Sequence, residues 1–269
     1  MDFCSRLIYP KASLNDTELK ERFADRWVVV TGASRGIGEA LVHRLIDAHA
    51  HLFLIARSEE KLQGLCTLAR QAGCSADYCA MDLRDKEQLV MLCKRLKENL
   101  PQADYLFCNA GKSIHRDITD ATDRLHDYDR TMDLNYRSMV ALSLALIPKL
   151  GERQGHIIYT SSVSTLYPPA PGWSAYHASK CAANTWCETA RTELKRQNII
   201  VQVAYLPLVH TEMSDATPAY RDLPAYTADE AACQLLKLSM SKRFSYKPWW
   251  ARLSAPVATL FAPLVKLFY

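Results

Sequence analysis

Tyr176 and Lys180 are residues whose types and spacing suggest chemistry in this 269-residue sequence. They lie four residues apart in a stretch with helical spacing, so both side chains are expected on one face of a helix. A tyrosine hydroxyl has a pKa near ~10 and exchanges protons poorly at neutral pH. A nearby ammonium group favours the phenolate and lowers that pKa, as general acid–base catalysis requires. The pair therefore predicts proton transfer to or from a substrate. His177 is expected to point about 100° away from Tyr176 on the same helix.

A glycine-rich segment, Thr31–Gly38, lies between the first predicted strand and the helix that follows it. Glycines let the chain turn sharply, and backbone N–H groups at a helix N-terminus bind phosphate. This placement predicts a nucleotide site. The residues of the segment expected to bind the nucleotide are Gly32, Ser34, Arg35, Gly36, Ile37 and Gly38.

Arg57 follows the second predicted strand, where a fold that binds NAD has an acidic residue for the ribose 2′-hydroxyl. A guanidinium there, together with Arg35, can bind a 2′-phosphate, which predicts NADP(H) rather than NAD(H). The alternative is that Arg57 only extends into solvent. After the next strand, Asp82 is placed to accept a hydrogen bond from the adenine amino group, with Leu83 beside it. The alternative is that Asp82 caps the helix beginning near Asp85.

Short apolar runs alternate with longer amphipathic stretches along the chain. The predicted strands are Trp27–Thr31, His51–Ala56, Ser75–Met81, Ala103–Asn109, His156–Ser161 and Ile199–Leu206, with Arg243–Lys247 as a shortened last strand. The predicted helices are Asn15–Ala24, Ile37–Ala48, Glu59–Ala72, Asp85–Leu100, Arg124–Leu150 and Ala175–Arg196. This alternation predicts the α/β class, a single doubly wound, Rossmann-type parallel sheet of about seven strands with helices on both faces. Ligands bind such sheets at the carboxyl ends of the strands.

Three segments are expected along the chain. Residues 1–25 form an N-terminal extension, residues 26–248 form the nucleotide-binding catalytic domain with a substrate loop at 208–227, and residues 249–269 form an apolar, basic tail.

In the order and spacing of its motifs, the chain resembles the classical short-chain dehydrogenases/reductases from about Ala24 to Met240. The glycine-rich segment matches the cofactor motif of that family. Cys108-Asn109-Ala110-Gly111 matches its Asn-Asn-Ala-Gly motif, with cysteine in the first place. The positions that match the catalytic residues of the family are Asn135, Ser162, Tyr176 and Lys180.

The resemblance implies a role for each of these residues. Lys180 would hold the nicotinamide ribose, and Asn135 would hold a water in a proton relay. Ser162 would donate a hydrogen bond to the substrate oxygen and stabilise a developing alkoxide. Ser161 and Ser164 are alternatives, because Tyr176 follows Ser162 by one residue more than is common in the family. The further cofactor contacts implied are Asn109, Ala110, Gly111, Tyr176, Lys180, Pro207, Val209 and Thr211, with Thr211 on the carboxamide.

The segment Val209–Tyr226 contains apolar residues and is expected to cover the substrate. Together with Pro207–Met213 it resembles family members related to bacterial fatty acyl-CoA reductases, which points to lipid metabolism. The expected function is NADPH-dependent reduction of a small hydrophobic carbonyl substrate such as a ketone, aldehyde or fatty acyl thioester. The alternatives are an NADP-dependent lipid or steroid alcohol dehydrogenase and a non-catalytic NADP-binding scaffold. The family also implies a homo-oligomer, a dimer or a tetramer.

Charge is distributed unevenly along the chain. Six of the 33 basic residues and none of the 29 acidic residues follow Glu230, where Trp249 and Trp250 begin an apolar segment. Aromatic residues with cations suit peripheral contact with a membrane. The alternative is a tail that packs on the domain or on another subunit. The basic residues are too few, and the rest of the chain too acidic, to predict a nucleic-acid partner.

The nine cysteines are scattered without a C-x-x-C pair, which is typical of thiols in a reducing compartment. No secretory signal is visible, so a cytoplasmic location is expected. His49 and His51 lack an evident third ligand, and no metal site is predicted.

Overall fold

The computed structural model describes residues 3–215 and 217–265. Its centre is one seven-stranded sheet, with the strand order β3-β2-β1-β4-β5-β6-β7 and parallel pairing between neighbours. The strands are β1 Trp27–Thr31, β2 His51–Ala56, β3 Ala76–Ala80, β4 Tyr105–Cys108, β5 His156–Ser162, β6 Ile200–Leu206 and β7 Ser245–Tyr246. The predicted Rossmann-type sheet is therefore confirmed.

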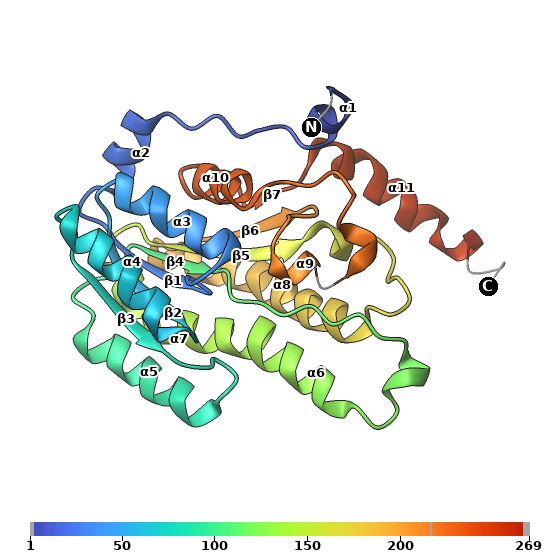
Figure 1. Ribbon diagram of the computed structural model, residues 1–269, viewed down its shortest axis with the longest axis horizontal. Coiled ribbons are helices and arrows are strands. Elements are labelled where there is room, and N and C mark those ends of the chain that lie inside the picture. The colour runs from blue at the N-terminus through green and yellow to red at the C-terminus, as the bar shows by residue number, and fades with distance from the viewer. Residues whose placement is uncertain (1–2, 216, 266–269) are drawn as a thin grey trace.

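Helices cover both faces of the sheet (Figure 1). The helices are α1 Phe3–Ile8, α2 Asp16–Phe23, α3 Gly36–Asp47, α4 Glu59–Gln71, α5 Lys86–Asn99, α6 Leu125–Met132, α7 Ser138–Glu152, α8 Ser174–Leu194, α9 Glu212–Asp215, α10 Ala228–Ser239 and α11 Trp249–Val265. Residues of α3, α4 and α10 share one buried cluster, and residues of α5, α7 and α8 share the other.

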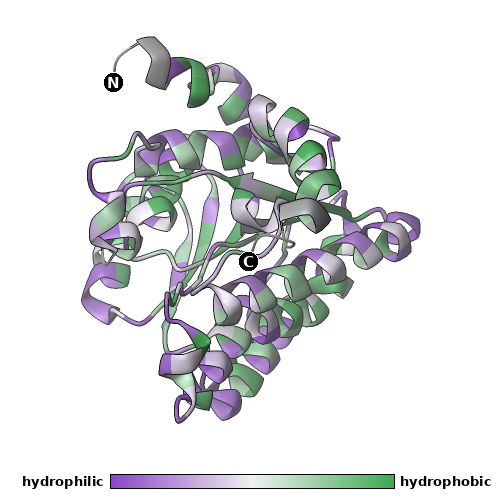
Figure 2. Cartoon of the chain, turned by 90° about the vertical axis from the view of Figure 1, so that its right-hand side faces the viewer, coloured by the Kyte–Doolittle hydropathy of each residue, from purple (hydrophilic) through white to green (hydrophobic). Residues whose placement is uncertain are grey.

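Alternate residues of each central strand enter the two clusters. In β1, Val28 and Val30 pack on the side of α3, whereas Val29 packs on the side of α5. This two-residue period with both faces buried explains why the strands are almost continuously apolar. Figure 2 shows the same arrangement, with hydrophobic colour along the central strands and both colours on the surrounding helices.

Most element ends are shifted by one or two residues from the predicted ones, and helix α1 was not predicted. Three further findings depart from the sequence predictions. The predicted helix Arg124–Leu150 is divided into α6, a π-helical segment Asp133–Arg137, and α7. Asp85 caps α5 by accepting hydrogen bonds from Glu87 N and Gln88 N, so the capping alternative for Asp82 is wrong. The tail forms a helix, α11, that the sequence did not predict; residues 266–269 lie outside the described residues.

No helix within the described ranges is both long and apolar enough to cross a membrane.

Candidate functional site

The order of the strands reverses between β1 and β4, which opens a crevice at their carboxyl ends. Thr31 closes the floor of this crevice. Its hydroxyl donates to the carbonyl oxygen of Phe107 at 3.3 Å and accepts from the backbone N–H groups of Asn109 and Ala110, each at 3.0 Å. The loops that follow the two strands are therefore fixed against each other.

Three glycines shape the first of these loops. Gly32 has a φ of +67°, and a Cβ on it would lie 2.9 Å from Cα of Ala110. A Cβ on Gly38 would lie 2.0 Å from the carbonyl oxygen of Gly32. Gly36 has a φ of +57° and faces the Thr211 side chain, which a Cβ would approach to 3.1 Å. The glycines thus keep a cradle clear at the N-terminus of α3, and its shape fits a dinucleotide phosphate.

The remaining predicted residues of this region are placed around the cradle. Ser34 is buried beneath it, and Ile37 packs on the core. Arg35 is paired with Glu212 at the start of α9, so its guanidinium joins the glycine loop to the substrate loop. Pro207 and Val209 are buried after β6.

Basic side chains follow the carboxyl ends of β2 and β3. Arg57 is exposed at the end of β2. Arg84 pairs with Asp82, with 2.5 Å between the guanidinium nitrogen and the carboxylate oxygen, and this contact lowers the pKa of Asp82. Arg57 also lowers that pKa by its charge. The Asp82 carboxylate, expected to bind adenine, is therefore already held by Arg84, while Leu83 is buried in the core.

Lys112 belongs to the same basic group, and the sequence interpretation missed it. Burial lowers the pKa of Lys112, and the positive charges of Arg84, Arg130 and Arg57 lower it further. Its position directly after Gly111 was a signal that could have identified it. The crevice therefore has a concentration of positive charge suited to an anionic ligand.

Helix α8 carries Tyr176 and Lys180, as predicted. Lys180 is buried, and its Nζ donates to the carbonyl oxygen of Thr160 at 2.8 Å. A Cβ on Gly111 would lie 3.5 Å from this Nζ, which places the loop after β4 directly beside the lysine. Burial lowers the pKa of Lys180 to about 7.

The pKa of Tyr176 is raised to about 12, mainly by burial, and the hydrogen bond with Ser162 opposes this rise. The lowering expected from a neighbouring ammonium group is therefore not found. The reason is geometric, because Lys180 is directed to Thr160 and lies over the ring of Tyr159, 4.7 Å from its centroid.

Ser162 lies next to Tyr176 and begins a chain of polar contacts behind it. The Oγ atoms of Ser162 and Ser164 are 2.8 Å apart, and Nε2 of His177 is 3.1 Å from Oγ of Ser164. The ring centroids of His177 and Tyr176 are 6.0 Å apart, and Ser164 and Ser162 connect the two side chains. Ser161, one residue earlier on β5, is buried, and its Oγ has no hydrogen-bond partner among the described residues.

Asn135 lies in the π-helical segment and is fully buried. Its Nδ2 donates to the Lys112 carbonyl and to Ser179 Oγ, both at 2.9 Å, and its Oδ1 accepts from Lys112 N at 2.8 Å. Both N–H groups of the side chain are thus used within the protein. The observed contacts make Asn135 a connection between the loop after β4 and α8.

Aromatic rings stand beside the catalytic pair. The ring of Tyr220, in the substrate loop, is stacked on Trp173 with centroids 6.1 Å apart, and Trp173 is 5.8 Å from Tyr176. The base of this loop is closed by hydrogen bonds between Tyr226 and residues 208 and 210. The sequence interpretation included Tyr220 in the loop but missed Trp173.

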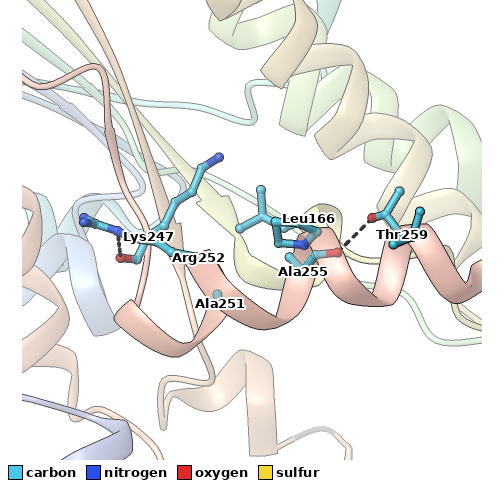
Figure 3. Close-up of a pocket in the computed structure, with 8 residues that line it drawn as sticks. Leu166, Lys247, Ala251, Arg252, Ala255 and Thr259 are labelled. Atoms are coloured by element: carbon cyan, nitrogen blue, oxygen red, sulfur yellow. Dashed lines mark hydrogen bonds between the residues drawn. The ribbon is translucent and has the colours of Figure 1, made fainter.

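A groove of about 680 Å³ lies between α11 and the 3-10 helix Val163–Leu166, which begins directly after Ser162. Figure 3 shows Leu166 against α11 beside Ala255. The residues that line the groove are Leu166, Lys247, Ala251, Arg252, Ala255, Pro256, Thr259 and Leu260. Neither Ser162, Tyr176 nor Lys180 lines it, so the groove flanks the catalytic residues rather than containing them.

A glycine cradle at the switch point, with a tyrosine, a lysine and a serine beside it, defines an oxidoreductase of the dinucleotide-binding class. The chain belongs to the short-chain dehydrogenase family, whose model matches residues 26–222, and this family uses a nicotinamide cofactor.

Known proteins similar to this chain agree with the assignment. The sequence is 35% identical to a fatty acyl-CoA reductase of Acinetobacter baylyi over 83% of this chain and 76% of that protein. It is also 35% identical to an uncharacterised oxidoreductase of Mycobacterium tuberculosis, over 80% of this chain and 64% of that protein. A short-chain dehydrogenase from Burkholderia cenocepacia, solved in complex with NADP, has a TM-score of 0.73 and 26% identity, covering 83% of this chain and 96% of that one.

Proposed function

We propose that this protein reduces a hydrophobic, lipid-like carbonyl with NADPH. The observation that carries the proposal is the position of Tyr176, Ser162 and Lys180 beside the glycine cradle, at one edge of the sheet. We assign Asn135, Ser162, Tyr176 and Lys180 as the catalytic residues, with Asn135 acting through the loop and helix that it connects.

The cofactor contacts follow from the shape of the crevice. The glycine loop would bind the pyrophosphate with its backbone N–H groups, and the loop after β4 would lie along the nicotinamide half. The bound cofactor supplies a hydride. The residues proposed to hold it are Gly32, Ser34, Arg35, Gly36, Ile37, Gly38, Arg57, Asp82, Leu83, Asn109, Ala110, Gly111, Tyr176, Lys180, Pro207, Val209 and Thr211.

The preference for NADP(H) rests on the positive charge near the end of β2. Arg57 is exposed, its charge acts on Asp82, and Arg84 and Lys112 lie in the same group. Because Asp82 is paired with Arg84, its negative charge is offset where a 2′-phosphate would bind. The Burkholderia relative, solved with NADP, supports the same choice.

Ser162 and Tyr176 have separate roles in the proposed reduction. The Ser162 hydroxyl donates a hydrogen bond to the substrate oxygen, and Tyr176 donates the proton that this oxygen needs as negative charge develops on it. Burial favours the protonated form of Tyr176, which suits a proton donor in the direction of reduction. Ser164 and His177 fix the orientation of the Ser162 hydroxyl from behind.

The substrate class is inferred from the surroundings of the site. Trp173 and Tyr220 form an aromatic wall beside Tyr176, and the groove under α11 is lined mainly by apolar side chains. An alkyl chain fits these surfaces, since burying each CH₂ contributes about 0.8 kcal/mol. The Acinetobacter relative, a fatty acyl-CoA reductase, supports an acyl thioester or the corresponding aldehyde.

The test follows NADPH oxidation with ketones, aldehydes and acyl-CoA thioesters of increasing chain length, with Tyr176→Phe as the control. Rates that rise with chain length would support a lipid substrate, and release of free CoA would identify the thioester. Efficient oxidation of lipid alcohols without carbonyl reduction would favour the dehydrogenase alternative. NADPH binding without any turnover would leave a scaffold and refute the proposal.

The other segments and the assembly are also proposals. We propose 1–25 as an extension to the domain 26–248, supported by the hydrogen bonds that Tyr226 and Gln234 donate to the carbonyl of Pro10. We propose a dimer or tetramer, supported by Val90, Met91 and Leu144, exposed on the adjoining helices α5 and α7. The free thiols among the described cysteines support a cytoplasmic location, and we propose residues 249–269 as a separate C-terminal tail.

A further inference from the structure

Helix α11 has its small residues inside and its large apolar residues outside. Ala251 and Ala255 face the domain and are 1% and 6% exposed, whereas Leu253 and Leu260 are 67% and 74% exposed. At about 100° per residue, Leu253, Val257 and Leu260 fall within about 60° of one another, opposite the two alanines. A surface helix ordinarily directs its apolar side inward and its polar side to solvent. This reversal predicts that an apolar phase covers the outer side of α11.

The N-terminal segment extends this surface. The indole nitrogens of Trp249 and Trp250 donate to the carbonyl oxygens of Leu7 and Ile8, at 2.8 and 3.0 Å. Figure 1 shows α1 next to the first turns of α11, which then projects from the body of the protein. We call the exposed apolar set on these two segments the α11 face. Its members are Leu7, Ile8, Trp249, Leu253, Val257, Leu260 and Phe261.

The charges around the α11 face suit an anionic partner. Arg252 is exposed and adjoins Leu253 on α11, Lys247 lines the groove on the inner side of the helix, and no acidic residue follows Glu230 in the sequence. A second copy of the chain fits less well. In a two-fold contact through the α11 face, the segment after Glu230 in the partner would supply no carboxylate to pair with Arg252. Tryptophan and cations beside an apolar helix are the composition that favours the headgroup region of a bilayer.

We propose that the α11 face docks the enzyme on an anionic phospholipid bilayer, with α11 lying in the headgroup region. Leu260 belongs to both the α11 face and the groove between α11 and the 3-10 helix Val163–Leu166, which flanks the catalytic residues. Docking would therefore place the mouth of the groove at the lipid surface. This link to catalysis rests on the proposed function, but the docking itself does not.

The test is flotation of the full-length protein with vesicles of phosphatidylcholine, with and without phosphatidylglycerol. The protein is expected to float with the anionic vesicles and to dissociate as salt is raised. Leu253→Ser/Leu260→Ser should weaken this binding about tenfold or more, because two exposed leucines that the bilayer would bury are lost. Arg252→Gln should weaken it about fivefold, which corresponds to one basic residue at an anionic surface.

The matched control is Leu68→Ser/Leu125→Ser, which removes two exposed leucines from α4 and α6 and should float as the wild type does. NADPH binding by every variant reports that the fold is intact. Wild-type protein that does not float, or equal flotation of the Leu253→Ser/Leu260→Ser variant, would overturn the proposal. A wild-type dimer that this variant converts to monomers, without vesicle binding, would instead make the face a subunit contact. No turnover is measured, so failure of the catalytic proposal would be seen separately.

Discussion

Gly38→Ala is the substitution whose effect can be worked out most directly from the structure. Its Cβ would lie 2.0 Å from the carbonyl oxygen of Gly32 and 2.9 Å from Nδ2 of Asn109. Ordinary contact begins at 3.4 Å, so α3 must move away from β1 by more than about 1 Å. Overpacking of this kind costs about 1–3 kcal/mol, and the close contact with backbone points to the upper end. Because the shift opens the phosphate cradle, we also expect NADPH to bind at least about tenfold more weakly.

Gly64→Ala provides the matched control, because the same methyl group is added within α4. No atom of the described residues lies within 4 Å of that Cβ position, and alanine favours a helix over glycine by about 0.5–1 kcal/mol. The two variants should therefore change stability in opposite directions. Urea unfolding gives the free energies of unfolding, and titration of protein fluorescence with NADPH gives the dissociation constants. Gly38→Ala with wild-type stability and wild-type NADPH affinity would refute the packing argument for the cradle.

Three further predictions concern charge and hydrogen bonding at the site. Arg57→Asp should shift the preference from NADPH toward NADH, because it replaces the proposed phosphate-binding cation with a carboxylate. An unchanged ratio of kcat/KM for NADPH to kcat/KM for NADH would count against Arg57 as the residue that binds the 2′-phosphate. His177→Phe should lower kcat about two- to tenfold with little change in NADPH affinity, since it removes one hydrogen bond to Ser164. An unchanged kcat and pH profile would show that the orientation of the Ser162 hydroxyl does not depend on His177. Burial holds the pKa of Lys180 at about 7 in the folded protein, against ~10.4 for an unfolded lysine, so the unfolded state binds the extra proton between these values. The free energy of unfolding should therefore rise with pH above about 7 more steeply in the wild type than in Lys180→Met, and parallel pH profiles of the two proteins would contradict the shift.

Local patterns were sufficient to predict the elements that carry the site. β1 and β2 have the predicted bounds, because each is an apolar run ended by a glycine or a polar residue. The positions of Tyr176 and Lys180 on one helix followed from their spacing alone. The glycine-rich segment was equally clear. The contact that requires Gly38 lies within the segment itself, and Gly32 contacts Ala110 in the loop after the neighbouring strand β4.

The features that were missed depend on contacts between distant segments. The stacking of Trp173 on Tyr220 requires the substrate loop to fold back over α8. The Arg35–Glu212 pair likewise joins residues that only the completed sheet brings together. The pKa values of Tyr176 and Lys180 depend on their burial, which spacing does not reveal. Helix α11 was not predicted because Pro256 interrupts its pattern, although the helix continues through it.

Transfer of deuterium from C4-labelled NADPH to a long-chain aldehyde, followed by mass spectrometry of the alcohol, tests the central claim most directly. The wild type should place the label on the former carbonyl carbon. Tyr176→Phe should bind NADPH normally but transfer the label at least about 100-fold more slowly, because the proton donor is gone. Transfer by Tyr176→Phe at the wild-type rate, or wild-type protein that binds NADPH and labels no carbonyl substrate, would contradict the account.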